Sequence, residues 1–220
     1  HVFWDELYIL PFYNLHFPEI SKSLLMYRYR RLNDAKEHAT EHGYLGAMYP
    51  WQTADDGKEE TQVIHYNPVS GNWDPDLSCR QRHVSLAIAY NVWQYFNTTN
   101  DIEFLKDYGL EMMLEISRFW ASIAEFDKAD GKYHIKGVMG PDEFHERYDE
   151  GEAGLKDNAY TNILTSWVLE QTLNAYKKID DISKQALKAK IGFSETELKE
   201  WKKIAKGLAV VINEQGLISQ

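Results

Sequence analysis

The 220-residue sequence predicts an all-α fold, and three observations support that prediction. Apolar residues recur at helical three-and-four spacing over several long segments. Two of these segments are apolar on nearly every face, which indicates helices buried on all sides. The other helical segments carry a charged face. Buried and half-exposed helices that alternate along a chain suggest two layers, an inner ring of helices within an outer one.

The early helices are marked by residues typical of helix ends. Pro18 opens the first of them, and a second is expected from Asn33 to His42, where Gly43 stops it. The two segments that are apolar on nearly every face are Val84–Phe96 and Tyr160–Tyr176. We expect both of these segments to be buried helices.

Two longer helices are expected to be amphipathic, one over Asp101–Phe126 and one from Leu198 to Ile212. In the second, Lys199, Glu200 and Lys202 form the charged face. Each helix follows residues that resemble a capping box, Asn100 with Glu103 and Ser194 with Glu197.

Three long polar connections separate the helices, Gly43–Asp76, Asp127–Gly140 and Pro141–Lys156. Connections of this length in a compact domain are usually functional. Lys132–Ile135 in the second connection has the pattern of one short hairpin strand. Asp74-Pro75-Asp76 in the first is more typical of a turn than of a calcium ligand set.

Composition excludes several classes of function. The chain has 24 Lys and Arg against 34 Asp and Glu, and this net charge of −10 argues against a nucleic-acid partner. No stretch approaches the roughly 20 apolar residues of a transmembrane helix, so we expect no membrane partner. The single cysteine, Cys79, excludes a disulfide framework and a multi-cysteine metal site. We expect no metal ion.

Aromatic residues make up 14% of the chain, including 7 Trp and 14 Tyr. A core explains most of them. Their flat faces also suit the C–H side of a pyranose, while carboxylates and amides bind its hydroxyls.

The third connection carries the residues best suited to chemistry. Together with Asp157, which directly follows it, the connection holds seven carboxylates against two cations, and we interpret most of these carboxylates as a solvated acidic loop. Asp142 and Glu143 differ, because Gly140-Pro141 restricts the backbone before them and Phe144 adds an apolar neighbour. A glutamate beside aromatic surface keeps its proton near neutral pH, as the general acid of a glycosidase must.

These residues also resemble a known family. Gly-Val-Met-Gly-Pro-Asp-Glu-Phe-His-Glu at 137–146, with Asp-Asn-Ala-Tyr-Thr-Asn at 157–162, resembles the catalytic-acid motif of glycoside hydrolase family 65. That family holds maltose, trehalose and kojibiose phosphorylases together with some hydrolases. Three further blocks resemble it in the same order, at 1–6, at 43–51 with 57–61, and at 82–95. The likeness runs from His1 to about Trp167.

The resemblance implies a segment of an (α/α)6 barrel, with residues 1–220 forming part of one catalytic domain. The two all-apolar helices would belong to the inner ring. The chain would be a piece of a longer protein with further domains. We expect that this chain, without the rest of the barrel, leaves apolar inner-ring faces such as Val84–Phe96 exposed.

The resemblance also implies roles for individual residues. Glu143 would donate a proton to the leaving sugar. Trp4 and Asp5 would line the subsite for the non-reducing glucosyl unit, with Asp5 accepting from its hydroxyls. The other residues that it places in the substrate site are Trp51, Glu59, His83 and Asp142.

The implied reaction is inverting cleavage of an α-glucosidic bond in a small α-glucoside. In a phosphorylase, inorganic phosphate is the co-substrate and β-glucose 1-phosphate the product; in a hydrolase, a second carboxylate activates water. No cofactor is implied in either case. Leu7 and Ala87 depart from the phosphorylase pattern, and these departures favour hydrolysis, with phosphorolysis as the alternative.

A non-catalytic helical toroid that binds sugar or protein is a further alternative, as is a scaffold whose aromatic residues are all core. The sequence leaves open whether the parent protein forms a homo-oligomer. It also leaves the compartment open, since a phosphorylase suits the cytoplasm and a hydrolase the periplasm or the outside.

Overall fold

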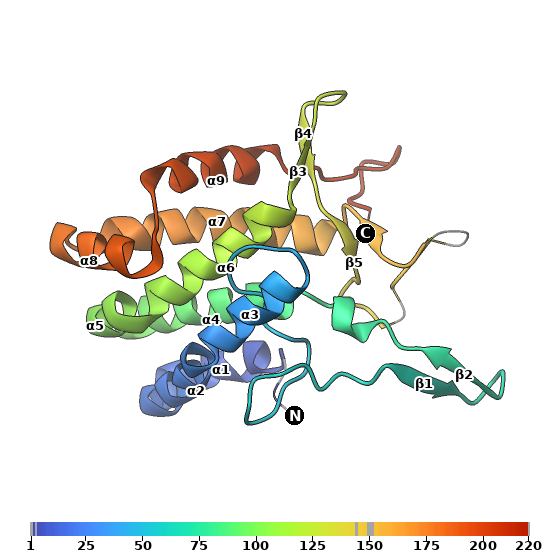
Figure 1. Cartoon of the computed structure of the whole chain (residues 1–220), viewed down its shortest axis with the longest axis horizontal. Coiled ribbons are helices and arrows are strands. Elements are labelled where there is room, and N and C mark those ends of the chain that lie inside the picture. The colour runs from blue at the N-terminus through green and yellow to red at the C-terminus, as the bar shows by residue number, and fades with distance from the viewer. Residues whose placement is uncertain (1, 3, 144, 149–151, 220) are drawn as a thin grey trace.

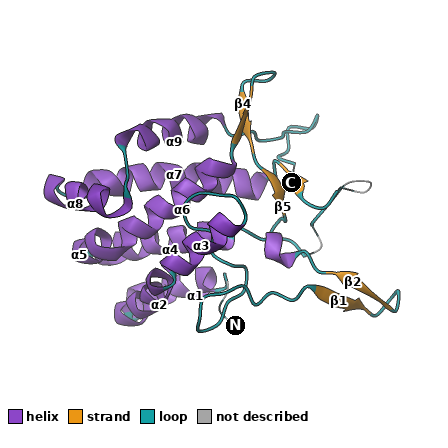
Figure 2. Cartoon of the chain, viewed as in Figure 1, coloured by secondary structure: helices purple, strands orange, loops and turns teal. Residues whose placement is uncertain are grey.

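The computed structural model describes residues 2, 4–143, 145–148 and 152–219, and most of these residues are helical (Figure 1). The helices lie in layers, while the strand pairs and long connections gather toward one end of them (Figure 2). None of the described helices is long and apolar enough to cross a bilayer. The described helices are α1 (Glu6–His16), α2 (Pro18–Arg30), α3 (Leu32–Glu41), α4 (Val84–Thr99), α5 (Ile102–Phe104), α6 (Leu110–Ile123), α7 (Ala159–Lys178), α8 (Asp181–Ile191) and α9 (Glu195–Gly207).

Helix α4 lies at the centre of the packing, where it contacts α1, α2, α6 and α7. Its side chains Val84, Ile88 and Val92 are at most 1% exposed. The prediction of a helix buried on nearly every side is therefore confirmed for α4. The expectation that Val84–Phe96 would lie open is wrong, because these four neighbouring helices already cover it.

The open apolar face lies on α1 instead. Tyr8, Phe12 and Leu15 follow helical spacing along one face of α1 and are 52–71% exposed. A contiguous apolar face such as this one on α1 usually marks a contact surface.

Helix α7 also departs from the prediction of a helix buried on nearly every side, since Ile163 in its first turns is 45% exposed.

The helix ends test the two predicted capping boxes. The box of Ser194 and Glu197 at the start of α9 is confirmed, and α9 ends at Gly207 rather than at Ile212. The box at Asn100 is wrong. Asn100 ends α4 in the left-handed conformation, with φ of 54°, and the side chain of Asp101 caps the next helix. Asparagine tolerates this conformation better than most residues, and this explains why Asn100 is the C-cap of α4.

The segment predicted as one amphipathic helix over Asp101–Phe126 is interrupted. A π-helical turn, Leu105–Gly109, joins α5 to α6, and the helix ends at Ile123. Such a turn inserts one residue into the helical ladder and shifts the faces that follow it.

Three short antiparallel strand pairs depart from an all-α fold. The hairpin strand predicted at Lys132–Ile135 is confirmed as β4, which ends one residue earlier at His134, and two further pairs were not expected. The pairs are β1 (Ile64–Asn67) with β2 (Asn72–Pro75), β3 (Glu125–Asp127) with β4 (Lys132–His134), and β5 (Lys136–Val138) with β6 (Leu155–Lys156). One unexpected pair, β1–β2, lies in the first long connection, and the other, β5–β6, joins the second connection to the third. Each is too short to give a clear period-two signal.

Candidate active site

A cavity of about 610 Å³ opens near the end of the helices where the long connections gather. Four residues singled out in the sequence, Trp4, Asp5, Trp51 and Glu143, line it together. The other lining residues are Gln52, Gln62, His65, Tyr66, Asp76, Ser78, Gln81, Met139, Pro141 and Glu146. Three segments that are far apart in the sequence thus share one site.

The first two of these segments are joined by backbone hydrogen bonds. The amide N–H of Val2 donates to Thr53 O at 2.7 Å, and that of Thr53 donates to Val2 O at 3.0 Å. The bridge brings the indole of Trp4 to 6.0 Å from that of Trp51, measured between ring centroids. Asp5 follows Trp4 directly at the start of α1. Two tryptophans and a carboxylate therefore lie together where a sugar could be held on its C–H face and on its hydroxyls.

Glu59 supports this wall from behind and does not line the cavity. Its carboxylate accepts hydrogen bonds from the amides of Trp51, at 3.1 Å, and of Gln52, at 3.3 Å. It also accepts from the amide and hydroxyl of Thr61. Glu59 instead borders a separate cavity of about 460 Å³. The structure thus places Glu59 as a brace for the turn that carries Trp51.

His83 lies beneath the two tryptophans. Its ring is 1% exposed and contacts Trp4 at 4.7 Å, Trp51 at 5.2 Å and Tyr160 at 5.7 Å, all between ring centroids. Burial lowers the pKa of His83 to about 4, so the imidazole is neutral near pH 7. His83 is therefore part of the aromatic packing behind the cavity and does not line it.

Glu143 lies on an exposed turn at the cavity edge. The amide of Gly140 donates to His145 O at 2.8 Å, and the amide of His145 donates to Asp142 O at 3.3 Å. Asp142 is exposed and is not among the described lining residues. Phe144, the expected apolar neighbour of the acid, lies outside the described residues.

Gly140 is required by close packing. A Cβ at this position would overlap Nδ1 of His145 and lie 3.0 Å from Nδ2 of Asn158. Asn158 caps α7, where its side chain accepts from the amide of Thr161 at 3.0 Å. The turn that bears Glu143 is therefore packed directly against the start of a long helix.

Asp157, just before α7, ties this region together. It is 6% exposed and has a φ of +58°. Its carboxylate accepts from Nδ1 of His134 at 2.7 Å and from Nδ2 of Asn162 at 3.2 Å. The hydrogen bond to Asp157 raises the pKa of His134, since it stabilises the protonated ring.

The hairpin β1–β2 and the residues beside it contribute a further part of the cavity lining, which sequence analysis missed. Asp76, interpreted from the sequence as part of a turn, lines the cavity and accepts from Nε2 of Gln62 at 2.5 Å. It also accepts from the amide of Ser78 at 2.8 Å. Burial alone would raise the pKa of Asp76, but the hydrogen bonds from Ser78 and Gln62 outweigh it, so the pKa is lowered. Glu146, interpreted as solvated, lines the cavity as well.

The lining residues give the cavity an acidic character. It has four carboxylates, on Asp5, Asp76, Glu143 and Glu146, and its described wall contains neither Lys nor Arg. Carboxylates accept hydrogen bonds from the hydroxyls of a neutral sugar. A phosphate group would be repelled by the same wall unless cations from elsewhere offset it.

A compact group of possible metal ligands lies away from this cavity, at the hairpin β3–β4. The ligand atoms of Asp127, Asp130 and His134 lie within 4.8 Å of one another. These atoms already have partners, because Nε2 of His134 contacts Asp130 at 3.1 Å and both aspartates accept from amides of the hairpin turn. We assign no metal to this group.

Comparisons with known proteins agree with the resemblance seen in the sequence. Residues 1–220 match the model of the glycosyl hydrolase family 65 central catalytic domain. The trehalose 6-phosphate phosphorylase of Lactococcus lactis is 44% identical over 220 residues, which are 100% of this chain and 27% of that protein. The kojibiose phosphorylase of Halothermothrix orenii is 41% identical over 209 residues, covering 92% of this chain and 26% of that protein. The chain thus spans about a quarter of the length of these two relatives.

The fold is shared with a solved structure. A putative kojibiose phosphorylase from the human microbiome superposes with a TM-score of 0.81 at 28% identity, covering 100% of this chain and 27% of that chain. The relatives named here are phosphorylases. They therefore support phosphorolysis better than hydrolysis, which the departures at Leu7 and Ala87 had favoured.

Replacing Gly140 by alanine should displace the turn that bears Glu143, because the new Cβ overlaps His145. We expect turnover of the full-length protein to fall by roughly 10²-fold, the loss typical of misplacing a reacting group by about 1 Å. Steady-state kinetics measure this. Gly43→Ala, which meets no atom within 4 Å but strains a φ of +79°, is the control and should lower stability while leaving turnover intact. Equal turnover in wild type and Gly140→Ala would contradict the packing argument.

The His134–Asp157 pair should make stability depend on pH. Because the folded-state pKa of His134 is raised, the pair stabilises the fold fully below the unfolded pKa of about 6.5, and loses this effect as pH rises through the folded pKa. The difference in Tm between wild type and His134→Gln should therefore shrink from pH 5.5 to pH 9. His16→Gln, at an exposed position in α1, controls for the loss of one imidazole. A difference that grows with pH would be inconsistent with this pair.

Proposed function

We propose an activity for this chain from one premise: the chain belongs to glycosyl hydrolase family 65, whose central catalytic domain model matches residues 1–220. The activity is inverting phosphorolysis of a small α-glucoside. Inorganic phosphate displaces the second sugar, and β-glucose 1-phosphate is released. The proposal applies to the full-length protein, to which this chain contributes one wall of the site.

One observation carries the proposal. Glu143, the residue that matches the family's catalytic acid, lines the same cavity as Trp4, Asp5 and Trp51, although these residues come from three separate segments. A non-catalytic toroid would not require a carboxylic acid and a sugar-binding wall in one cavity. A scaffold whose aromatic residues all lie in the core would not leave a cavity open beside Glu143.

The reaction requires one proton transfer and one displacement at carbon. Trp4 and Trp51 hold the C–H faces of the glucosyl ring, and Asp5 accepts from its hydroxyls. Glu143 transfers its proton to the glycosidic oxygen as the C1–O bond breaks, which turns the second sugar into a neutral leaving group. An oxygen of phosphate attacks C1 from the opposite face and inverts it. The Glu143 carboxylate regains a proton before the next turnover.

The acidic lining of the cavity bears on where the full-length protein binds phosphate. The described lining residues hold neither Lys nor Arg, so we assign the phosphate site to residues elsewhere in the full-length protein. The named relatives are about four times as long as this chain, which leaves ample sequence for that site. No cofactor is needed for this reaction.

We also infer that the helices form a segment of an (α/α)6 barrel. The match to the family's central catalytic domain and the similarity to a solved relative support this inference. In a closed ring, the exposed apolar face of α1, with Tyr8, Phe12 and Leu15, would pack against helices that this chain does not contain.

Phosphate dependence is the central test of this function. The full-length protein should cleave at least one of kojibiose, trehalose, maltose, nigerose and trehalose 6-phosphate when phosphate is supplied, and β-glucose 1-phosphate should form in equal amount to the freed sugar. Proton NMR of the first product distinguishes the β from the α anomer. Release of free glucose at an unchanged rate without phosphate would show hydrolysis instead.

Glu143→Gln should reduce turnover of the disaccharide by about 10²–10⁴-fold, because the amide has no proton to transfer. The C1–F bond of α-glucosyl fluoride breaks to release fluoride ion without that proton, so phosphorolysis of this substrate should be affected far less. Glu152→Gln, at an exposed position in the same loop, is the matched control and should keep normal turnover of both substrates. Equal losses on both substrates in Glu143→Gln would rule out the acid role.

A further inference from the structure

The loop that carries Glu143 leaves and rejoins the fold at one narrow place, beside Arg80. Met139 directly follows the entering strand, and its amide donates to the backbone oxygen of Arg80 at 3.0 Å. At the other end of the loop, Nη1 of the Arg80 side chain donates to the carbonyl oxygen of Ala153. A single residue thus binds both the start and the end of the acid-bearing loop.

The two ends of the loop and the Arg80 side chain are closely packed. Strand β5 before the loop pairs with β6 after it, Val138 opposite Leu155. A Cβ on Gly154 would lie 2.6 Å from Cα of Gly137 and 2.8 Å from Nη1 of Arg80. Gly154 has a φ of +109°, a conformation that other residues rarely adopt. The two chain segments therefore contact each other and the guanidinium directly.

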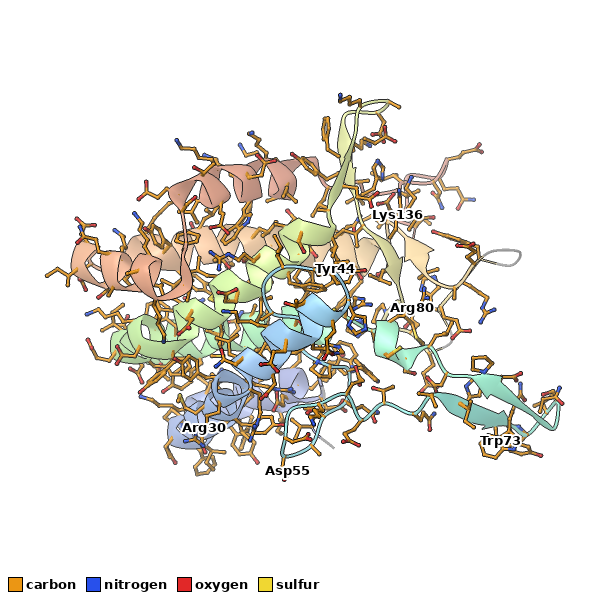
Figure 3. All side chains as sticks on the ribbon, viewed as in Figure 1. Arg30, Tyr44, Asp55, Trp73, Arg80 and Lys136 are labelled. Carbon is orange, nitrogen blue, oxygen red and sulfur yellow. The ribbon has the colours of Figure 1, made fainter. Side chains whose placement is uncertain are left out.

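Arg80 also connects the loop to the cavity wall. It ends the short 3-10 helix η1 (Ser78–Arg80), and both Ser78 and Gln81 line the cavity. Figure 3 labels Arg80 at the end of the molecule where the strands gather. A long cationic side chain at this point suits a loop that is rich in carboxylates.

We propose that Arg80 is a positioning residue, which holds the loop so that the carboxyl group of Glu143 reaches the glycosidic oxygen. This inference rests on the proposed function, because it concerns the acid of that reaction. Arg80 is not among the described residues that line the cavity, so it acts through the loop. Loss of the side chain should impair proton donation more than it impairs binding of the sugar.

The test compares two leaving groups in the full-length protein. Arg80→Ala should lower kcat for the best disaccharide by roughly 10–100-fold, the range expected when a reacting group is misplaced by less than about 1 Å. KM should change little, and phosphorolysis of α-glucosyl fluoride should fall less than about threefold, since fluoride needs no proton from Glu143. Arg80→Lys can still donate to Ala153 O and should recover part of the loss.

Lys136→Ala is the matched control. Lys136, also labelled in Figure 3, is a cation on β5 whose exposed side chain contacts Glu125 at 2.9 Å. Loss of the Lys136 side chain should leave kcat unchanged for both the disaccharide and α-glucosyl fluoride. The Tm of each variant shows whether the fold is retained, and Arg80→Gln replaces Arg80→Ala if the alanine variant does not fold.

Equal loss on both substrates in a folded Arg80 variant would overturn the proposal, as would no loss on either. Glu143→Gln is measured beside it. If Glu143→Gln spares the fluoride and the Arg80 variants do not, only the role of Arg80 is refuted. If Glu143→Gln itself affects both substrates equally, the acid role that the proposed function gives to Glu143 is refuted too.

Discussion

The enclosure of helix α4 by α1, α2, α6 and α7 is the constraint on which the cavity depends. His83 directly precedes α4, and its buried ring lies in contact with Trp4 and Trp51. Because protein interiors are close-packed, α4 cannot shift without moving the two tryptophans that form one wall. The neutral state of His83 follows from the same burial. The shape of the cavity therefore depends directly on how the core around α4 is packed.

The charge of the cavity separates the two ligands that the proposed reaction needs. In the proposed reaction the carboxylates that line the cavity would accept from neutral sugar hydroxyls, whereas two like charges about 6 Å apart repel by roughly 3 kcal/mol at an effective dielectric constant near 20. The proposed function therefore assigns the binding of phosphate to cations on other parts of the full-length protein. In the proposed reaction the anionic nucleophile attacks from the face opposite the proton donor, as inversion requires.

Helix positions and the acid motif could be predicted from the sequence, because helical periodicity and a contiguous motif are local signals. Trp4, Asp5, Trp51 and Glu143 were placed in one site through the family resemblance, and the structure brings them together. Asp76 and Glu146 could not be found, since only the hairpin β1–β2 and the return of the acidic loop bring them to the cavity. Glu59 and His83 were expected in the substrate site, but their contacts support Trp51 from behind.

The pairing of β5 with β6, with Gly137 against Gly154, has a consequence for how related proteins diverge. Because the two ends of the acidic loop are fastened side by side, residues can be inserted between them without moving either end. Doubling the length of such a loop costs only about 0.6 kcal/mol in closure entropy. A longer loop interior would therefore leave the two attachments of the loop that carries Glu143 unchanged.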